Sequence, residues 1–145
     1  MGHTYRTRHD VIRVLLVDDS AAIRTGVSAL LESTPDLTLS ASWGDASEAV
    51  AAADVSADIV LMDIRMPGVD GIAATSALLA AKPGAKILVL TAFAAGDEVV
   101  RARDAGAVGV VAKAEGPAAL LTALRTVAAG GTVWPEQRRR PGHPG

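Results

Sequence analysis

The sequence predicts an α/β fold, a three-layer sandwich in which a five-stranded parallel sheet lies between two layers of helices. Two observations carry this prediction. Apolar runs alternate with helix-like stretches five times between residues 11 and 130, and four of the five runs are continuously apolar. Continuous runs are typical of strands that are covered on both faces, as in a parallel sheet. Five such units with right-handed crossovers fit the flavodoxin-like (βα)5 arrangement, with strand order 2-1-3-4-5.

The five predicted strands are short and differ in their patterning. They cover residues 11–17, 37–43, 59–62, 86–91 and 108–112. Only residues 37–43 alternate between apolar and polar side chains, which is typical of a half-buried strand. The other four runs predict strands with two covered faces.

Helical periodicity appears after the strands. The helix after the first strand has one apolar face with i, i+4, i+7 and i+8 spacing (Ile23, Val27, Leu30 and Leu31), and the last helix repeats it (Leu120, Leu124, Val127 and Ala128). Asp45 stands three residues before Glu48, which predicts a capped helix through Ala53. Two further helices are predicted over residues 71–81, ending before a Pro-Gly pair, and over residues 97–105, ending at a C′ glycine.

Composition bounds the class of protein. The chain has 145 residues, half of them hydrophobic, which fits one folded domain and excludes a disordered chain. Cysteine is absent, so disulfides, thiolate metal sites and cysteine nucleophiles are excluded. No apolar stretch approaches the roughly 20 residues of a membrane span, and the basic N-terminus leads into no long apolar segment. We expect a cytoplasmic protein that does not contact membranes.

Charge and composition divide the chain into three parts. Residues 1–10 are a basic tail, residues 11–130 form the domain, and residues 131–145 are a linker rich in proline, glycine and arginine. Residues 10–136 hold 9 of the 14 basic residues and all 16 acidic ones, a net charge of −7. Such a body repels phosphate backbones and is a poor nucleic-acid binder. The arginines at 138–140 are interpreted as a solvated tail, with contact to an acidic surface as the alternative.

Polar side chains follow the predicted strands at one edge of the sheet. Asp18 and Asp19 follow the first strand, Asp63 the third, Thr91 ends the fourth, and Lys113 follows the fifth. In open α/β sheets, ligands bind beyond the carboxyl ends of the strands. Clustered carboxylates repel one another and acquire raised pKa values unless a cation joins them. Mg²⁺, a hard ion with oxygen ligands, is the expected cation.

Each of these residues also has a simpler interpretation. Asp18 or Asp19 alone suits a cap for the following helix, Asp63 a turn, Thr91 an ordinary strand end, and Lys113 the surface. The coincidence of all five at one edge favours a reactive site. A carboxylate can accept a phosphoryl group covalently, while a metal ion and a lysine neutralise the oxygens of that group. Asp63 is the expected nucleophile because it lies alone at the end of the central strand.

Four stretches resemble the receiver domain of bacterial two-component response regulators. They are Leu-Leu-Val-Asp-Asp-Ser at residues 15–20, Met-Asp-Ile-Arg-Met-Pro-Gly-Val-Asp-Gly at 62–71, Leu-Val-Leu-Thr-Ala at 88–92 and Val-Val-Ala-Lys at 110–113. The resemblance covers roughly residues 11–130. It implies that Asp63 is the phosphoacceptor of a sensor histidine kinase. It also implies that Asp18, Asp19, Asp63 and the Arg65 carbonyl hold Mg²⁺, and that Thr91 and Lys113 contact the phosphoryl group.

The exit from the domain adds to the resemblance. Residues 130–135, Gly-Gly-Thr-Val-Trp-Pro, are similar to the linker of NarL/FixJ-type regulators, which leads to a DNA-binding helix-turn-helix domain for transcription regulation. We find no such domain in the printed sequence, and expect either a shortened chain or a stand-alone receiver. A homodimer is the other partner that the resemblance implies, and DNA contact is expected only through an output domain.

One position departs from the family pattern. Receivers usually carry Tyr or Phe three residues before the lysine, a ring that moves inward when the threonine engages the phosphoryl group, and here that position is Val110. Phe93 is either a substitute for that ring or a packing residue.

Two other functions compete with that of a phosphorylated receiver. A receiver that works without phosphorylation is favoured only by Val110. A haloacid-dehalogenase-like phosphatase needs an Asp-x-Asp pair and a cap, and this chain has neither.

Overall fold

The computed structural model describes residues 11–45, 57–66, 68–92, 94 and 96–135. Its strands are β1 (Ile12–Val17), β2 (Leu37–Trp43), β3 (Ile59–Asp63), β4 (Arg65–Met66), β5 (Val69–Asp70), β6 (Ile87–Thr91) and β7 (Gly109–Ala112). Its helices are α1 (Ala21–Glu32), α2 (Gly71–Ala81), α3 (Gly96–Ala105), the short 3₁₀ helix η4 (Lys113–Glu115) and α4 (Pro117–Ala128).

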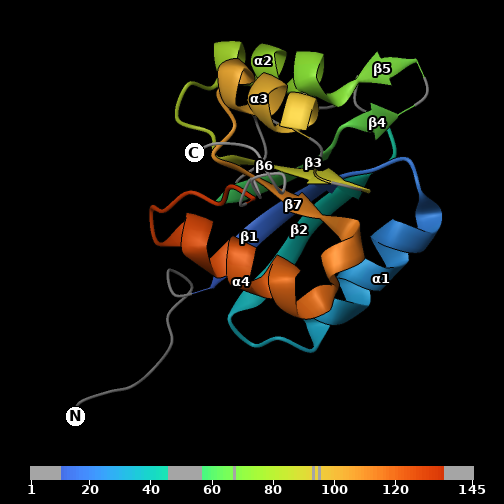
Figure 1. The fold of residues 1–145 in the computed structure, drawn as a ribbon. Coiled ribbons are helices and arrows are strands. Elements are labelled where there is room, and N and C mark those ends of the chain that lie inside the picture. Colours follow the sequence, from blue (N-terminus) through green and yellow to red (C-terminus); the bar gives the residue numbers. More distant parts are fainter. Residues whose placement is uncertain (1–10, 46–56, 67, 93, 95, 136–145) are drawn as a thin grey trace, which may run out of the picture.

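Five strands form one parallel sheet in the order β2-β1-β3-β6-β7. Counted along the chain, this is the predicted order 2-1-3-4-5. The labels jump from β3 to β6 because β4 and β5 form a separate antiparallel ribbon, which the sequence analysis did not predict. Figure 1 shows α2 and α3 on one face of the sheet and α1 and α4 on the other, so the three-layer sandwich is confirmed.

The central strands are buried on both faces because each contributes alternate side chains to two cores. Leu16 and Leu61 pack with the apolar faces of α1 and α4, while Leu15 and Met62 pack beneath α2. Both kinds of position are fully buried in β1 and β3, which is why these strands carry continuous apolar runs. Strand β2, the one with alternating residues, lies at the edge of the sheet.

The predicted bounds of strands and helices agree with the structure to within about two residues, except in one segment that the structure does not describe. The predicted helix capped by Asp45 extends through residues 46–53, which lie outside the described part of the chain. Helix α1 is capped by Ser20, whose hydroxyl accepts a hydrogen bond from the Ile23 N–H at 3.2 Å. The alternative that Asp18 or Asp19 caps this helix is therefore wrong. Gly106, the predicted C′ residue of α3, has a φ of +102°.

The first residues of the predicted linker contact the sheet. Val133 forms a parallel bridge to Gly109, and backbone hydrogen bonds join Val110 N to Val133 O (2.8 Å) and Val133 N to Val108 O (3.1 Å). The Trp134 ring lies under the Arg103 guanidinium, 4.5 Å from its carbon to the ring centroid. Residues 132–135 thus run along the outer edge of β7 and reach α3.

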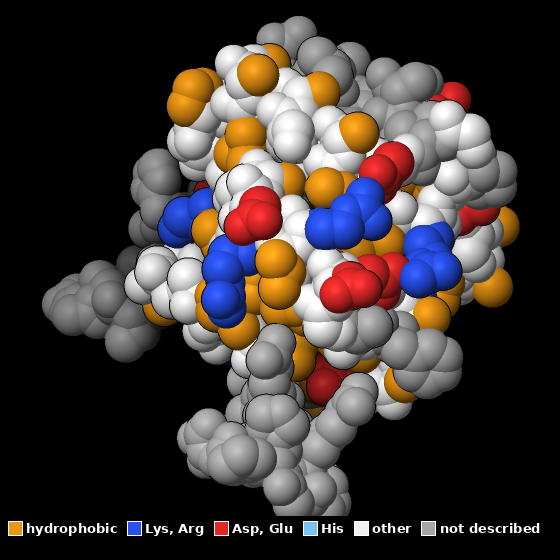
Figure 2. Space-filling model, turned by 45° about the horizontal axis from the view of Figure 1, so that its top comes forward, with side chains coloured by type: hydrophobic (Ala, Val, Ile, Leu, Met, Phe, Trp, Pro, Cys, Tyr) orange, Lys and Arg blue, Asp and Glu red, His pale blue; other side chains and the backbone are white. Residues whose placement is uncertain are grey.

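Charged side chains of both signs mix on the face that carries α2 and α3. In Figure 2, blue and red side chains lie next to one another on this side of the molecule. Arg101 pairs with Asp70 across it, 2.9 Å from Nη2 to Oδ2. Among the described residues, no helix is long and apolar enough to cross a membrane.

Candidate functional site

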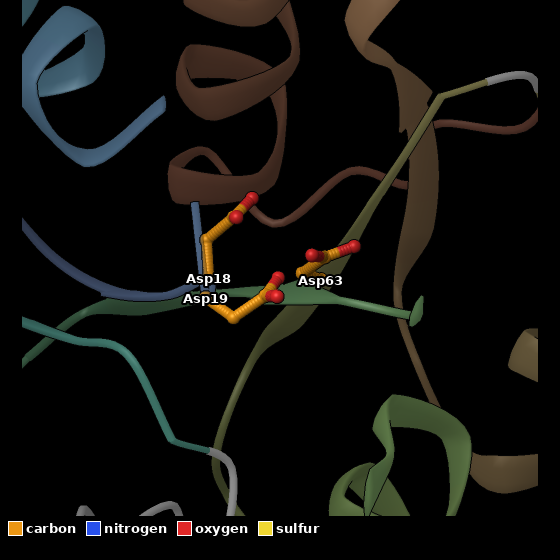
Figure 3. A group of neighbouring side chains, drawn as sticks. All are labelled: Asp18, Asp19 and Asp63. Atoms are coloured by element: carbon orange, nitrogen blue, oxygen red, sulfur yellow. The ribbon is translucent and has the colours of Figure 1, made fainter. Parts of the chain in front are cut away.

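Three carboxyl groups meet at the carboxyl ends of β1 and β3. Asp18 and Asp19 follow β1, and Asp63 is the last residue of β3, with which β1 is paired. One carboxylate oxygen from each residue lies within 4.8 Å of the other two. Figure 3 shows the three side chains gathered at this edge of the sheet. Asp18 and Asp63 are buried, whereas Asp19 is exposed.

Asp18 is held by a backbone N–H of its own loop and by a side chain of α1. The Ser20 N–H donates to its Oδ1 at 2.9 Å, and Nη1 of Arg24 donates to its carbonyl oxygen at 2.7 Å. Its Oδ2 is buried and forms an ion pair with Lys113, while no described residue directs an aligned hydrogen bond at this atom. Lys113 therefore supplies the positive charge that this buried oxygen needs, because a charge buried in protein requires a partner.

Lys113 joins two of the acids. Its Nζ lies 2.9 Å from Oδ2 of Asp18 and 3.6 Å from Oδ2 of Asp63. Strand β7 ends at Ala112, directly before it, and the 3₁₀ helix η4 begins at Lys113 itself. The sequence prediction that Lys113 reaches the acidic group is confirmed.

Burial is the main influence on the Asp63 carboxyl. The pKa of Asp63 rises to about 6, and burial is the largest cause. The negative charges of Asp18 and Asp19 also raise this pKa, while the Arg65 N–H and Lys113 lower it. The Arg65 N–H donates to Oδ1 of Asp63 at 3.1 Å. Repulsion among carboxylates, the cause of such a shift expected from the sequence, is smaller than the effect of burial.

A close backbone approach fixes the loop after Asp63. The Gly71 N–H donates to the Ile64 carbonyl at 3.0 Å, at the start of α2. A Cβ atom at Gly71 would collide with the Asp63 carbonyl oxygen and lie 2.7 Å from the Ile64 Cα. Only glycine therefore lets α2 begin against the end of β3, which explains the glycine that closes the motif at residues 62–71.

Thr91 has a partner that the sequence did not predict. It ends β6, whose Leu90 is in register with Asp63. Its Oγ1 donates a hydrogen bond to Oε1 of Glu98 at 3.3 Å. Nε of Arg65 donates to Oε2 of Glu98 at 2.8 Å, and Nη2 of Arg65 forms an ion pair with the same oxygen at 2.6 Å. Glu98 was missed because an acid in the first turn of a helix is an ordinary feature of exposed helices.

The donor set fits a hard divalent cation. With all three carboxyls ionised, one ammonium leaves two negative charges uncompensated, and every ligand atom offered is a carboxylate oxygen. Asp19 is open to solvent and would allow water to complete the coordination, as Mg²⁺ requires. Beside Asp19, a depression of about 790 Å³ is lined in part by Arg65, Glu98 and Arg101. A small ligand can therefore approach the acidic group from this side.

Comparison with known proteins identifies the family. Residues 14–125 match the model of the family described as the response regulator receiver domain. The chain belongs to this family. The receiver is 39% identical over 121 residues to the transcriptional regulatory protein LiaR of Bacillus subtilis, covering 83% of this chain and 57% of that protein. It is 36% identical to the response regulator GacA of Pseudomonas viridiflava, with 83% and 56% covered.

Solved structures agree with this assignment. A LuxR-family two-component response regulator from Aurantimonas sp. is 35% identical, with a TM-score of 0.80 over 85% of this chain and 89% of that one. The signal receiver domain of the NarL response regulator of Mycobacterium tuberculosis is 26% identical, with a TM-score of 0.75 over 83% and 98%. The receiver spans a little more than half the length of its curated relatives. A haloacid-dehalogenase-like phosphatase is not supported by these matches.

The position that departs from the family pattern lies in the core. Val110 is 1% exposed and packs in one cluster with Val99 and Ala102 of α3, against which Trp134 also packs. Phe93, the proposed substitute ring, lies outside the described residues. Its two interpretations therefore stay predictions.

Proposed function

We propose that this receiver accepts a phosphoryl group on Asp63 from the phosphohistidine of a sensor histidine kinase, in a Mg²⁺-dependent reaction. The observation that carries the proposal is the position of Asp63, buried at the end of the central strand with its Oδ2 3.6 Å from the Lys113 ammonium. Response regulators as a family partner with sensor histidine kinases. The transfer takes place in the cytoplasm under this proposal.

Asp63 suits the nucleophile better than its two neighbours. Asp18 is held more closely than Asp63: the Ser20 N–H donates to its Oδ1 at 2.9 Å and Lys113 lies 2.9 Å from its Oδ2. At Asp63, the corresponding distances to the Arg65 N–H and to Lys113 are 3.1 and 3.6 Å. Asp19 is exposed, so water screens its charge from the lysine. With a pKa of about 6, Asp63 is mostly ionised at pH 7.5 and remains a stronger nucleophile than an ordinary aspartate.

The transfer exchanges one bond to phosphorus for another. An oxygen of Asp63 forms the new P–O bond as the P–N bond to the imidazole breaks, and the electron pair leaves with the imidazole nitrogen, which takes a proton from solvent. Lys113 faces the oxygens of the transferred group and balances their charge. Asp18, Asp19, Asp63 and the Arg65 carbonyl would hold Mg²⁺, which supplies further positive charge to those oxygens when bound.

The relatives that suggest a DNA-binding output are longer than this chain. LiaR and GacA are named as a transcriptional regulatory protein and a response regulator, and each is nearly twice as long as the part matched here. We infer that phosphorylation of this receiver controls a DNA-binding output through residues 131–145. The proposal includes formation of a homodimer. The alternative function is a receiver that signals by protein contact alone.

The test is the intact mass of the protein after incubation with acetyl phosphate, with and without Mg²⁺. In this reaction acetate is the leaving group, and the same P–O bond forms at Asp63. We expect one phosphoryl adduct that requires Mg²⁺ and is absent from Asp63→Asn. Asp97→Asn, an exposed acid on α3, is the matched control and should load like wild type. An adduct that persists in Asp63→Asn would refute the site, and no adduct in any protein would favour a phosphorylation-independent receiver.

A further inference from the structure

Glu98 is a nearly buried acid with two partners on two different strands, β4 and β6. Its side chain is 11% exposed, although it lies in the first turn of α3. Its Oε2 accepts a hydrogen bond from Nε of Arg65 at 2.8 Å and forms an ion pair with Nη2 at 2.6 Å. Its Oε1 accepts a hydrogen bond from the Thr91 hydroxyl at 3.3 Å. Arg65 follows β3 and Thr91 ends β6. Glu98 therefore links the start of α3 to the segment directly after Asp63 and to the end of β6.

The Thr91 hydroxyl cannot serve two acceptors at once. A hydroxyl carries one hydrogen, and in this structure that hydrogen is directed at the carboxylate of Glu98. Under the proposed function, the same hydroxyl contacts a phosphoryl oxygen on Asp63. Glu98 and the phosphoryl group are thus competitors for one donor, and an ionised carboxylate is a strong competitor.

Arg65 connects this competition to Asp63. Its backbone N–H donates to Oδ1 of Asp63 at 3.1 Å, while its guanidinium holds Glu98. The guanidinium itself is mostly exposed, so its main effect is to fix the carboxylate of Glu98 in place beside Thr91. When Thr91 turns to a phosphoryl oxygen, Glu98 loses one partner while keeping the other. The free energy of that lost contact favours the unphosphorylated receiver.

We propose that Glu98 is a positioning residue that holds the Thr91 hydroxyl toward α3 and thereby opposes phosphorylation of Asp63. The inference rests on the proposed function, because it concerns the regulation of the same site. A contact that exists only in the unphosphorylated state stabilises that state. It therefore lowers the ratio of phosphorylated to unphosphorylated protein by a factor set by the free energy of the contact. Removing the Glu98 acceptor therefore shifts the receiver toward its phosphorylated form.

The experiment measures the phosphorylated fraction by intact mass at a fixed, subsaturating concentration of acetyl phosphate with Mg²⁺. We expect Glu98→Ala to raise the ratio of phosphorylated to unphosphorylated protein about threefold to tenfold, the equivalent of one hydrogen bond. Glu98→Gln, which keeps an acceptor but loses the charge, should give a smaller rise and serves if the alanine variant folds poorly. The control Asp97→Asn removes a charge from the same helical turn and should match wild type.

A second comparison separates positioning from a merely structural role. Thr91→Val keeps the shape of the side chain and removes the hydroxyl. Adding Glu98→Ala to Thr91→Val should then produce no rise, because the competition no longer exists. A rise of the same size in that background would overturn the inference, as would equal loading of wild type, Glu98→Ala and Glu98→Gln. An absence of adduct in every protein, wild type included, would instead overturn the proposed function and this inference with it.

Discussion

The residue Asp63 is 3% exposed, and its pKa rises to about 6, chiefly through burial. In the unfolded chain the same group has a pKa near its ordinary value of 3.8. A folded-state pKa above the unfolded one means that ionisation costs folding free energy. The cost is fully present above about pH 6 and is lost as the pH falls toward 4.

Asp63→Asn should therefore stabilise the metal-free receiver at pH 7.5. We expect a gain on the order of 1–3 kcal/mol there, which shrinks to near zero at pH 4, where the aspartate is protonated in the folded state. Denaturant unfolding of both proteins at the two pH values, in the presence of a chelator, measures this difference. A variant less stable than wild type at pH 7.5 would contradict the account of Asp63.

Most residues of the site could be predicted from the local sequence, and Glu98 could not. Asp18, Asp19, Asp63, Thr91 and Lys113 were predicted from the sequence because each stands at the end of an apolar run. Glu98 was not predicted. Its burial depends on Arg65, 33 residues away, and no local pattern distinguishes it from its exposed neighbour Asp97. Long-range pairing of this kind is decided by tertiary structure.

At the scale of elements, the contact between β3 and α2 depends on one glycine. Replacing glycine by alanine within a helix normally stabilises it by about 1 kcal/mol. Gly71 is an exception, because an added Cβ would collide with the Asp63 carbonyl oxygen. Gly26, in the middle of α1, has no atom within 4 Å of the position of such a Cβ.

The same substitution should have opposite effects at these two positions. Gly26→Ala should stabilise the receiver by about 1 kcal/mol. Gly71→Ala should destabilise it by about 1–3 kcal/mol, the usual cost of overpacking, and should also slow phosphorylation by displacing Asp63. Thermal unfolding and acetyl phosphate loading of both variants provide the comparison. Equal stability of the two variants would show that α2 does not need the close approach.

The strands of the sheet and the helices α1, α2, α3 and α4 were predictable because apolar periodicity reports burial directly. The ribbon of β4 and β5 was not. Each of its strands has two residues, too few for any periodicity, and the motif at residues 62–71 was interpreted as a phosphoacceptor motif, with a turn as the simpler alternative for Asp63. Contact of Val133 with β7 was missed for a similar reason, since a Gly-Gly pair precedes it and the segment resembles a linker.

The whole molecule is acidic outside its tails. Residues 10–136 carry a net charge of −7, and basic and acidic side chains alternate on the α2 and α3 face. Affinity for DNA depends largely on neutralising phosphates with clustered basic residues. This body offers the opposite charge, which supports the proposal that an output domain makes the DNA contact.

The chain of 145 residues should therefore bind duplex DNA weakly, whether phosphorylated or not. We expect a dissociation constant no tighter than about 10⁻⁴ M at about 0.1 M salt, at the weak end of non-specific binding. Fluorescence anisotropy with a labelled random-sequence duplex provides the measurement. Tight binding would assign a nucleic-acid contact to this chain, and removal of residues 137–145 would then show whether the arginine tail is responsible.

The central claim is that Asp63 carries the phosphoryl group. The most direct test is borohydride reduction after loading with acetyl phosphate and Mg²⁺, because this reagent converts an aspartyl phosphate to homoserine. Peptide mass mapping then locates the reduced residue. The account predicts homoserine at position 63 alone, dependent on Mg²⁺. Reduction at Asp18 or Asp19, or no reduced residue in protein that carries an adduct, would contradict it.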